Sequence, residues 1–302
     1  MAITLGPHQY GKAENRVVRI VRDTPRHEIT DVNVSTCLRG DFDDAHLTGD
    51  QGTVLPTDTQ KQTAYAYAKT VGLNPVEDYA LALARHFVDD VEPVRGARIE
   101  VEEFAWQRVL VDGAEHDHTW VRSGQEVRTA AITVDGAGDS RVEHVIQGLK
   151  DLTILKSTGS EFHGFLKDEF TVLQPTDDRI MATSLVAQWR FAPGTSADWN
   201  AVYATVKGVL TSVFATHHSL ALQQTLFEMG KAALEAVPEL VEIRMSAPNK
   251  HHFEYDLGRF GIESQGEVFH ADDRPYGLIQ ASVVRDEEPA APLAWKQYSG
   301  LV

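Results

Sequence analysis

The sequence predicts an α+β protein built from two tandem ββααββ units with antiparallel sheets, the first over residues 1–140 and the second over residues 141–302. Three observations support this prediction. Apolar residues alternate with polar ones in paired segments that flank turns, which is typical of antiparallel strands. Between these pairs, apolar residues recur at helical spacing. The same order of elements returns in the second half, and 302 residues fit two domains of roughly 150 residues each.

In the first half, two strands precede two helices and two more strands follow. The strands are expected at residues 15–22, 29–38, 97–111 and 119–134. The first helix is expected from Thr57 to Lys69, where apolar residues take helical spacing. Asn74 as N-cap, Pro75 at the first helical position and Glu77 in the first turn begin the second helix. Its apolar stripe consists of Val76, Tyr79, Ala80, Leu83 and Phe87.

The second half repeats this order. Strands are expected at residues 152–156, 180–191, 240–246 and 267–284. Ser196 caps the first helix, and Ser219 begins a second one that Pro238 ends. The stripe of the first helix is expected to face the core and contains Trp199, Val202, Tyr203, Val206, Leu210 and Val213. Because helices on one side leave the other face and the edges of such sheets open, we expect self-association that continues the sheets, up to a closed barrel.

Composition excludes several classes of protein. The chain has 28 lysines and arginines against 44 aspartates and glutamates, a net charge of −16, which disfavours binding to nucleic acid or an anionic membrane. No segment reaches the roughly 18 apolar residues of a membrane span. Cys37 is the only cysteine and is expected to be a buried, inert thiol in a reducing compartment. The first residues do not resemble a signal peptide, and Gly300-Leu301-Val302 do not resemble a peroxisomal address, so we expect a cytoplasmic protein.

The common cofactor motifs are incomplete. Gly136-Ala137-Gly138 is followed by Arg141 where a dinucleotide fingerprint needs its third glycine, so NAD and FAD are not expected. The glycine-spaced segment that ends at Gly164 has Phe165 where a P-loop needs lysine. The sequence contains no Gly-x-Ser-x-Gly elbow, so a serine hydrolase is not expected. The pairs His116 and His118, His217 and His218, and His251 and His252 have no evident third ligand, so we expect no catalytic metal.

Four segments, in order along almost the whole chain, together resemble the urate oxidase (uricase) family: Gln9-Tyr10-Gly11-Lys12, Thr57-Asp58-Thr59-Gln60-Lys61-Gln62-Thr63, Leu155-Lys156-Ser157-Thr158-Gly159-Ser160-Glu161-Phe162-His163-Gly164-Phe165 and Pro248-Asn249-Lys250-His251-His252-Phe253. The resemblance implies the tunnelling fold (T-fold), with two ββααββ units per chain and a homotetramer around a tunnel. It also implies that Thr57 and Asp58 of one subunit meet Arg179 and Gln223 of its neighbour.

The resemblance assigns the site residues. It implies that Arg179 and Gln223 clamp the substrate, that Phe162 stacks on it and that Leu222 adds a backbone contact. A guanidinium donates two parallel hydrogen bonds to an anionic ring, and a carboxamide both donates and accepts. Lys12, Thr57 and His251 match the family's catalytic residues, and the resemblance implies that Thr57 also contacts the substrate. It further implies that Asp58 helps to bind and orient the substrate and that Asn249 flanks the place of dioxygen or water.

Taken without the resemblance, the same residues have ordinary structural interpretations. The residue pattern alone predicts that Phe162 packs in the core and that Arg179 is a surface or ion-paired arginine. Lys12 is then a solvated loop lysine, Thr57 a helix N-cap and His251 a hydrogen-bonded strand histidine. An N-cap at Thr57 would still favour an anionic ligand, because the helix begins there with a positive end.

The implied reaction needs no cofactor. Urate, dioxygen and water would give 5-hydroxyisourate and hydrogen peroxide, with the deprotonated, electron-rich substrate acting as the reductant. Two alternatives stay open from the sequence. One is another purine- or pterin-directed T-fold enzyme, such as a cyclohydrolase, and the other is a purine-binding oligomer without activity. The second alternative has no need for Lys12, Thr57 and His251.

Overall fold

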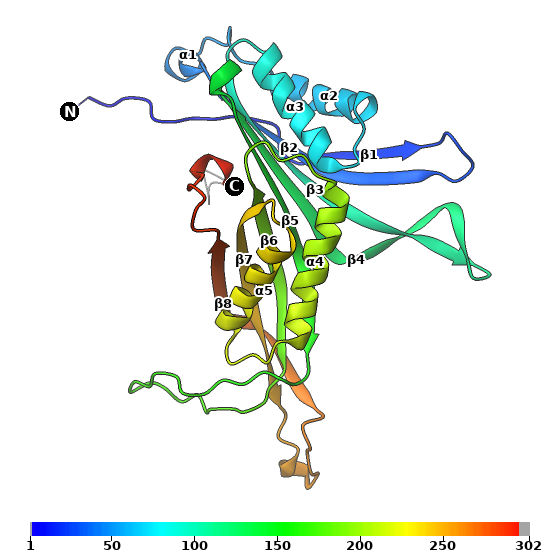
Figure 1. The fold of residues 1–302 in the computed structure, drawn as a ribbon, viewed down its shortest axis with the longest axis vertical. Coiled ribbons are helices and arrows are strands. Elements are labelled where there is room, and N and C mark those ends of the chain that lie inside the picture. The colour runs from blue at the N-terminus through cyan, green and yellow to red at the C-terminus, as the bar shows by residue number, and fades with distance from the viewer. Residues whose placement is uncertain (1, 296–302) are drawn as a thin grey trace. The chain divides into compact units, whose positions relative to one another are not determined.

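The computed structural model describes residues 2–295. Its elements follow in the order β1 (Asn15–Val21), β2 (Glu28–Gly40), α1 (Asp43–Leu47), α2 (Thr57–Thr70), α3 (Val76–Asp90), β3 (Val94–Val111), β4 (Ala114–Asp135), β5 (Val142–Lys156), β6 (Met181–Phe191), α4 (Trp199–Thr216), α5 (Leu222–Ala236), β7 (Leu240–Glu254) and β8 (Phe269–Val284) (Figure 1). Apart from the short α1 and three 3₁₀ turns, this is the expected ββααββ order, found twice.

The strands form one eight-stranded sheet in chain order, β1 to β8. The pairs β1 with β2, β2 with β3, β3 with β4, and β7 with β8 are antiparallel. The α+β class with antiparallel pairing is therefore confirmed. The described residues divide into two compact units: residues 2–148, 190–200 and 289–295 form the first, and residues 149–189 and 201–288 form the second.

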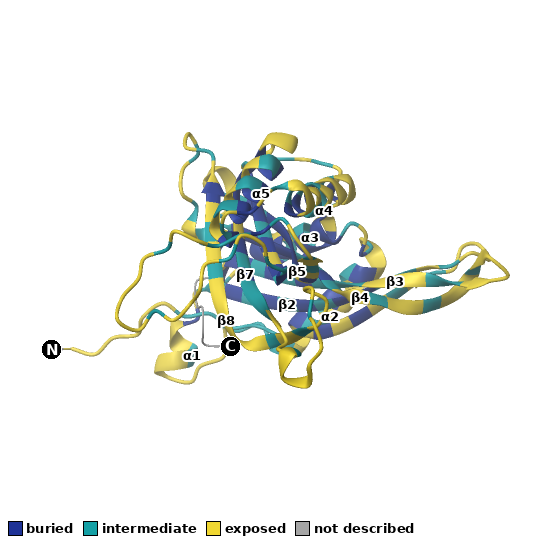
Figure 2. Cartoon of the chain, turned by 90° about the horizontal axis from the view of Figure 1, so that it is seen from below, coloured by how far each residue is buried: buried dark blue, intermediate teal, exposed yellow. Residues whose placement is uncertain are grey.

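The core of the first unit lies between the sheet and α3. Residues in the second half of β2 alternate between buried and half-buried, and α3 packs on β3 and β4 (Figure 2). The predicted stripe of α3 is confirmed, because all its members are buried. Cys37 was expected to be buried but is half-buried. Neighbouring strand residues face opposite sides, and the buried Thr36 and Leu38 take the core face.

In the second unit, α5 packs on β7 and β8. Leu226, Met229 and Ala233 of α5 are buried, as their spacing predicts. Gly230 allows the helix to approach closely, since a Cβ there would lie 2.6 Å from Cγ2 of Val283 in β8. None of the helices within residues 2–295 has the length and apolar character that a membrane crossing requires.

The predicted start of α2 at Thr57 is confirmed. The starts predicted for α3, α4 and α5 are wrong by one to three residues. Asn74 and Ser196 precede their helices, which begin at Val76 and Trp199. Ser219 does not begin α5, which starts at Leu222. Its hydroxyl instead accepts a hydrogen bond from Oγ1 of Thr225 at 2.8 Å, and its backbone pairs with a preceding loop. The tripeptide Gly300-Leu301-Val302 lies outside the described residues.

Candidate active site

The expected site residues fall into two groups, one in each compact unit. Lys12, Thr57 and Asp58 belong to the first unit. The second unit holds Phe162, Arg179, Leu222, Gln223, Asn249 and His251. Each group is built by different local contacts and is described within its own unit.

Lys12 lies in the loop before β1, and β2 holds its backbone. Its N–H donates to Oγ1 of Thr36 at 3.1 Å, and its carbonyl accepts from the N–H of Thr36 at 2.9 Å. Gly11 permits this close approach, because a Cβ at that position would lie 1.7 Å from the carbonyl oxygen of Thr36. The glycine therefore lets the loop lie directly against β2, which fixes the backbone of Lys12.

Thr57 and Asp58 are the first two residues of α2. Pro56 is the N-cap, so the expected N-cap role of Thr57 is wrong, and no side chain in the described part of the protein caps the helix. A hydrogen bond and ion pair with Lys61 lower the pKa of the exposed Asp58 carboxyl, and the charge of Lys12 contributes in the same direction. Thr57 thus stands half-buried at the positive end of the helix, where an anion is favoured.

In the second unit, backbone bridges bring the loop that carries Phe162 to the start of α5. The N–H of Glu161 donates to the carbonyl of Ser219 at 2.8 Å, and the N–H of Ser219 donates to Gly159 at 3.0 Å. Phe162 exchanges hydrogen bonds with Thr176 at 2.8 and 3.0 Å. These bonds hold the Phe162 loop against the turn that leads into Leu222 and Gln223.

Arg179 forms a backbone hydrogen bond with the same loop, and its guanidinium lies over the ring of Phe162. Its N–H donates to the carbonyl of Ser160 at 2.8 Å, and its guanidinium carbon lies 5.0 Å from the ring centre of Phe162. Nε is buried without a hydrogen-bond partner among the described residues, and burial lowers the pKa of the guanidinium. A buried donor without a partner is costly, so an anionic acceptor would stabilise this side chain.

The N-terminus of α5 supplies the next two residues. Leu222 is buried and anchors the first turn, whereas the Gln223 side chain is exposed. No side chain among residues 2–295 caps this helix. Its first backbone N–H groups, which have no partners within a helix, and the exposed carboxamide of Gln223 can therefore both bind a polar ligand.

Asn249 and His251 lie on β7 at an irregular point of the β7–β8 ladder. Asn249 pairs with Gly277 and His251 with Asp272, and the register shifts between them. Both side chains are half-buried. The His251 ring stacks with Phe253 at 5.7 Å between centroids and an angle of 26°. Such bulges often redirect side chains next to functional sites.

One cluster within residues 2–295 has the composition of a cation site. Glu161, His163 and Asp177 place ligand atoms within 4.8 Å of one another, and no ion is present. The Glu161 oxygens already accept from His163 at 2.5 Å and His218 at 3.0 Å. These bonds lower the pKa of the Glu161 carboxyl. The cluster differs from the histidine pairs considered in the sequence, and its histidine–carboxylate bonds account for its compactness without an ion.

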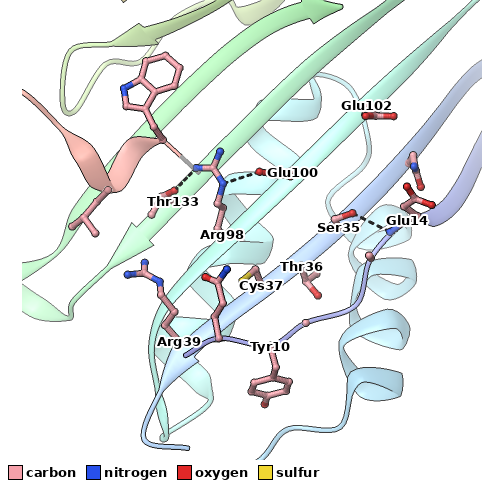
Figure 3. Close-up of a pocket in the computed structure, with 16 residues that line it drawn as sticks. Tyr10, Glu14, Ser35, Thr36, Cys37, Arg39, Arg98, Glu100, Glu102 and Thr133 are labelled. Atoms are coloured by element: carbon pink, nitrogen blue, oxygen red, sulfur yellow. Dashed lines mark hydrogen bonds and ion pairs between the residues drawn. The ribbon is translucent and has the colours of Figure 1, made fainter. Parts of the chain in front are cut away.

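A cavity of about 500 Å³ opens in the first unit on the β2–β3 side of the Lys12 loop (Figure 3). Gly11 and Ala13 line it, but none of the expected site residues does. Its cations are already paired: Arg98 donates to Glu100 at 2.8 Å and to Thr133 at 3.0 Å, and Arg39 lies 2.6 Å from Asp135. This charge balance makes the cavity a poor anion site.

The fold and these groups define an α+β protein with one antiparallel sheet, whose second unit presents an arginine over an aromatic ring. The model of the Uricase family matches residues 8–133 and 145–280. The chain belongs to the uricase family, the urate oxidases, and is therefore an oxidoreductase.

Individual relatives agree with this assignment. The uricase of Arthrobacter globiformis is 48% identical over 298 residues, covering 99% of this chain and 95% of the relative. That of Cyberlindnera jadinii is 34% identical over 303 residues, covering 95% and 99%. The crystal structure of the Arthrobacter globiformis uricase has a TM-score of 0.90 and covers 96% of this chain and 98% of that one. Urate oxidase from Bacillus sp. TB-90, at 22% identity and a TM-score of 0.78, covers 92% and 100% and supports the fold alone.

Sequence reasoning missed the residues that hold these groups in place. Thr36 and Ser219 each join a loop to another element, and Gln60 is fully buried in α2. Gln60 stands inside a segment already recognised, but nothing in its neighbourhood signals that a glutamine there is buried. Thr36 follows the strand period and looks like any other β2 residue. Only the contacts reveal their roles.

Proposed function

We propose that the chain oxidises urate with dioxygen and water, without a cofactor, at a site formed by Lys12, Thr57, Arg179, Gln223 and their neighbours. Membership of the uricase family supports the reaction. The observation that carries the site is the buried Nε of Arg179, which has no partner among the described residues and belongs to a guanidinium 5.0 Å from the Phe162 ring centre. A flat anion satisfies both features, since it accepts from the guanidinium and stacks on the ring.

Most of the binding contacts are assigned to the second unit, and Thr57 and Asp58 of the first unit also contact the substrate. Arg179 donates to one edge of the ring and Gln223 exchanges hydrogen bonds with the opposite edge. Phe162 stacks on the face of the ring, and the backbone of Leu222 adds a hydrogen bond. Arginine suits this task better than lysine, because its planar fork makes two parallel bonds. In a chain of net charge −16, this guanidinium and the helix N-termini provide the local positive potential that an anion requires.

Chemistry is assigned to Lys12 and Thr57 of the first unit and His251 of the second. Lys12 and Thr57 remove a proton from urate and activate water, and His251 restores the proton balance through the lysine. Asp58 orients the substrate, and Asn249 holds the place of dioxygen or water. The overall step transfers two electrons from urate to dioxygen. Dioxygen takes up two protons to become hydrogen peroxide, and the oxygen of water forms the new C–OH bond of 5-hydroxyisourate.

The assembly is part of the proposal. In the T-fold homotetramer that the family resemblance implies, Thr57 and Asp58 of one subunit meet Arg179 and Gln223 of the next, and the sheets close into a barrel around a tunnel. The unit boundaries at residues 1–140 and 141–302 and the cytoplasmic location remain predictions of the sequence.

The experiment follows urate and peroxide together. Purified protein, stripped of metal by a chelator, is incubated with urate in air. Loss of urate absorbance with peroxide formed in equal amount supports the oxidase. Urate loss without peroxide would favour a hydrolase such as a cyclohydrolase, and binding without turnover would favour a purine-binding oligomer. Either of these results contradicts the proposal.

A further inference from the structure

A buried polar chain joins the loop that carries Lys12 to the helix that begins with Thr57. Oγ1 of Thr36 accepts the N–H of Lys12 at 3.1 Å and donates to Oε1 of Gln60 at 2.7 Å. Gln60 lies one turn after Thr57, and its N–H donates to the carbonyl of Pro56 at 3.1 Å, closing the first turn of α2. A single hydroxyl therefore connects both catalytic segments.

A second pair of hydrogen bonds meets at the carbonyl of Leu55, two residues before Thr57. The carbonyl of Leu55 accepts from Nε2 of Gln60 at 3.4 Å and from the hydroxyl of Tyr10 at 3.0 Å. Tyr10 precedes Lys12 by two residues and is itself fixed to β2 through backbone bonds with Leu38. The Lys12 loop and the entry to α2 are thus linked at two points.

Burial makes this arrangement specific. The side chain of Gln60 is fully buried and that of Thr36 nearly so. The Thr36 hydroxyl has one proton, and the short bond to Gln60 uses it, which leaves the oxygen to accept from Lys12. A buried polar group that loses its partner is costly, so the chain holds its members in one geometry.

We infer that Thr36 and Gln60 are positioning residues that set the separation of Lys12 and Thr57 for proton transfer. The inference rests on the proposed roles of Lys12 and Thr57 and extends them to two residues that touch no substrate. Correct placement of reacting groups is worth large factors in rate, and an error of about 1 Å costs on the order of a hundredfold. Most urate contacts are assigned to Arg179, Gln223 and Phe162, so urate binding depends little on this spacing.

The test uses Gln60→Met and Thr36→Val, which keep the approximate size of each side chain and remove its hydrogen bonds. We expect kcat to fall by about ten- to a hundredfold in each. The Kd of urate, measured without dioxygen so that no turnover occurs, should change by less than about threefold. Thr36→Ser keeps the hydroxyl and should retain most of kcat. The double variant should be little worse than either single variant, because both break the same chain.

Tyr79→Phe is the matched control for folding. Tyr79 is fully buried, and its hydroxyl donates to the carbonyl of Ala64 in the middle of α2 at 2.9 Å. Its removal costs a comparable buried bond without touching the Lys12 loop or the first turn of α2. The Tyr79→Phe variant should be less stable than the wild type but have the same kcat. If kcat falls equally in Tyr79→Phe, or if Thr36→Ser is as slow as Thr36→Val, the effect is general destabilisation and the inference is wrong.

Variants of the catalytic residues distinguish a failure of the positioning inference from a failure of the proposed catalytic site. If Lys12→Met and Thr57→Val abolish turnover while Gln60→Met and Thr36→Val leave kcat intact, the positioning inference fails and the proposed site stands. If Lys12→Met and Thr57→Val stay active, the proposed catalytic roles fail, and the inference fails with them.

Discussion

The guanidinium carbon of Arg179 lies 5.0 Å from the centre of the Phe162 ring, on a loop that backbone bonds tie to the turn before α5. The arrangement presents a cation, an aromatic face and a helix N-terminus in one region of the second unit. The cation–π contact also holds the guanidinium in place before any ligand binds, which reduces the entropy lost on binding.

Arg179→Lys should weaken urate binding. A lysine keeps the charge but loses the planar pair of donors, and hydrogen bonds to charged groups are each worth about 1.5–3 kcal/mol, so KM should rise roughly ten- to a hundredfold. Steady-state kinetics measures this change. Arg259→Lys is the control, because Arg259 also lies over a ring, 5.3 Å from the centre of Tyr255, in the same unit but outside the proposed site. Unchanged KM in Arg179→Lys would remove the arginine from the substrate clamp.

Lys12→Met should abolish turnover and leave urate binding largely intact. The methionine keeps an unbranched apolar stem, one atom shorter than that of lysine, and cannot accept or donate a proton. Rapid mixing with urate in air measures turnover, and equilibrium binding without dioxygen measures affinity. Lys69→Met, at an exposed position in the last turn of α2, should behave as the wild type. Normal turnover in Lys12→Met would refute the catalytic role.

Glu77→Gln should strongly destabilise the first unit. Glu77 is 1% exposed, and both of its carboxylate oxygens accept from Nη2 of Arg128, at 2.8 and 2.9 Å. Its Oε1 also accepts from Nε2 of Gln147 at 2.7 Å. Breaking a buried ion pair from one side costs about 3–5 kcal/mol. The midpoint of urea unfolding checks the loss.

A surface pair provides the comparison for Glu77. Asp90→Asn removes the charge from the exposed partner of His86, and such pairs contribute about 0–1 kcal/mol. If Glu77→Gln shifts the unfolding midpoint no more than Asp90→Asn, the buried pair contributes little to stability.

His144 should make stability depend on pH below neutrality. Burial, reinforced by the charge of Arg190, lowers the pKa of this imidazole from its ordinary 6.5. Between the folded pKa and 6.5 the unfolded chain binds more protons, so stability rises with pH there. The contribution is complete above 6.5 and is lost as the pH falls through that value towards the folded pKa.

His144→Gln removes this titration. The thermal midpoint of the wild type should fall more steeply than that of the variant between about pH 7 and about pH 5. His270→Gln, at an exposed position on β8, should keep the slope of the wild type. Equal slopes in the wild type and His144→Gln would show that the buried imidazole does not couple folding to pH.

The order of elements was predictable because it depends on local patterns. Alternating apolar residues identified β2, and helical spacing identified the buried stripe of α3, since each element must bury one face. Helix starts were less predictable, because several polar residues near a start can serve as caps. Ser219 resembles a cap in sequence, but tertiary contacts use its backbone and hydroxyl to join the Phe162 loop to α5.

The sequence by itself determined the α+β class, the repeated ββααββ order and the identity of the candidate residues, since periodicity and short segments such as Thr57-Asp58-Thr59 are local properties of the chain. Only the tertiary structure decided which groups share a unit, that Arg179 lies over Phe162 and that Gln60 is buried against Thr36. These contacts join residues distant in sequence. Their geometry depends on how β2, α2 and the loops pack, and no local pattern encodes it.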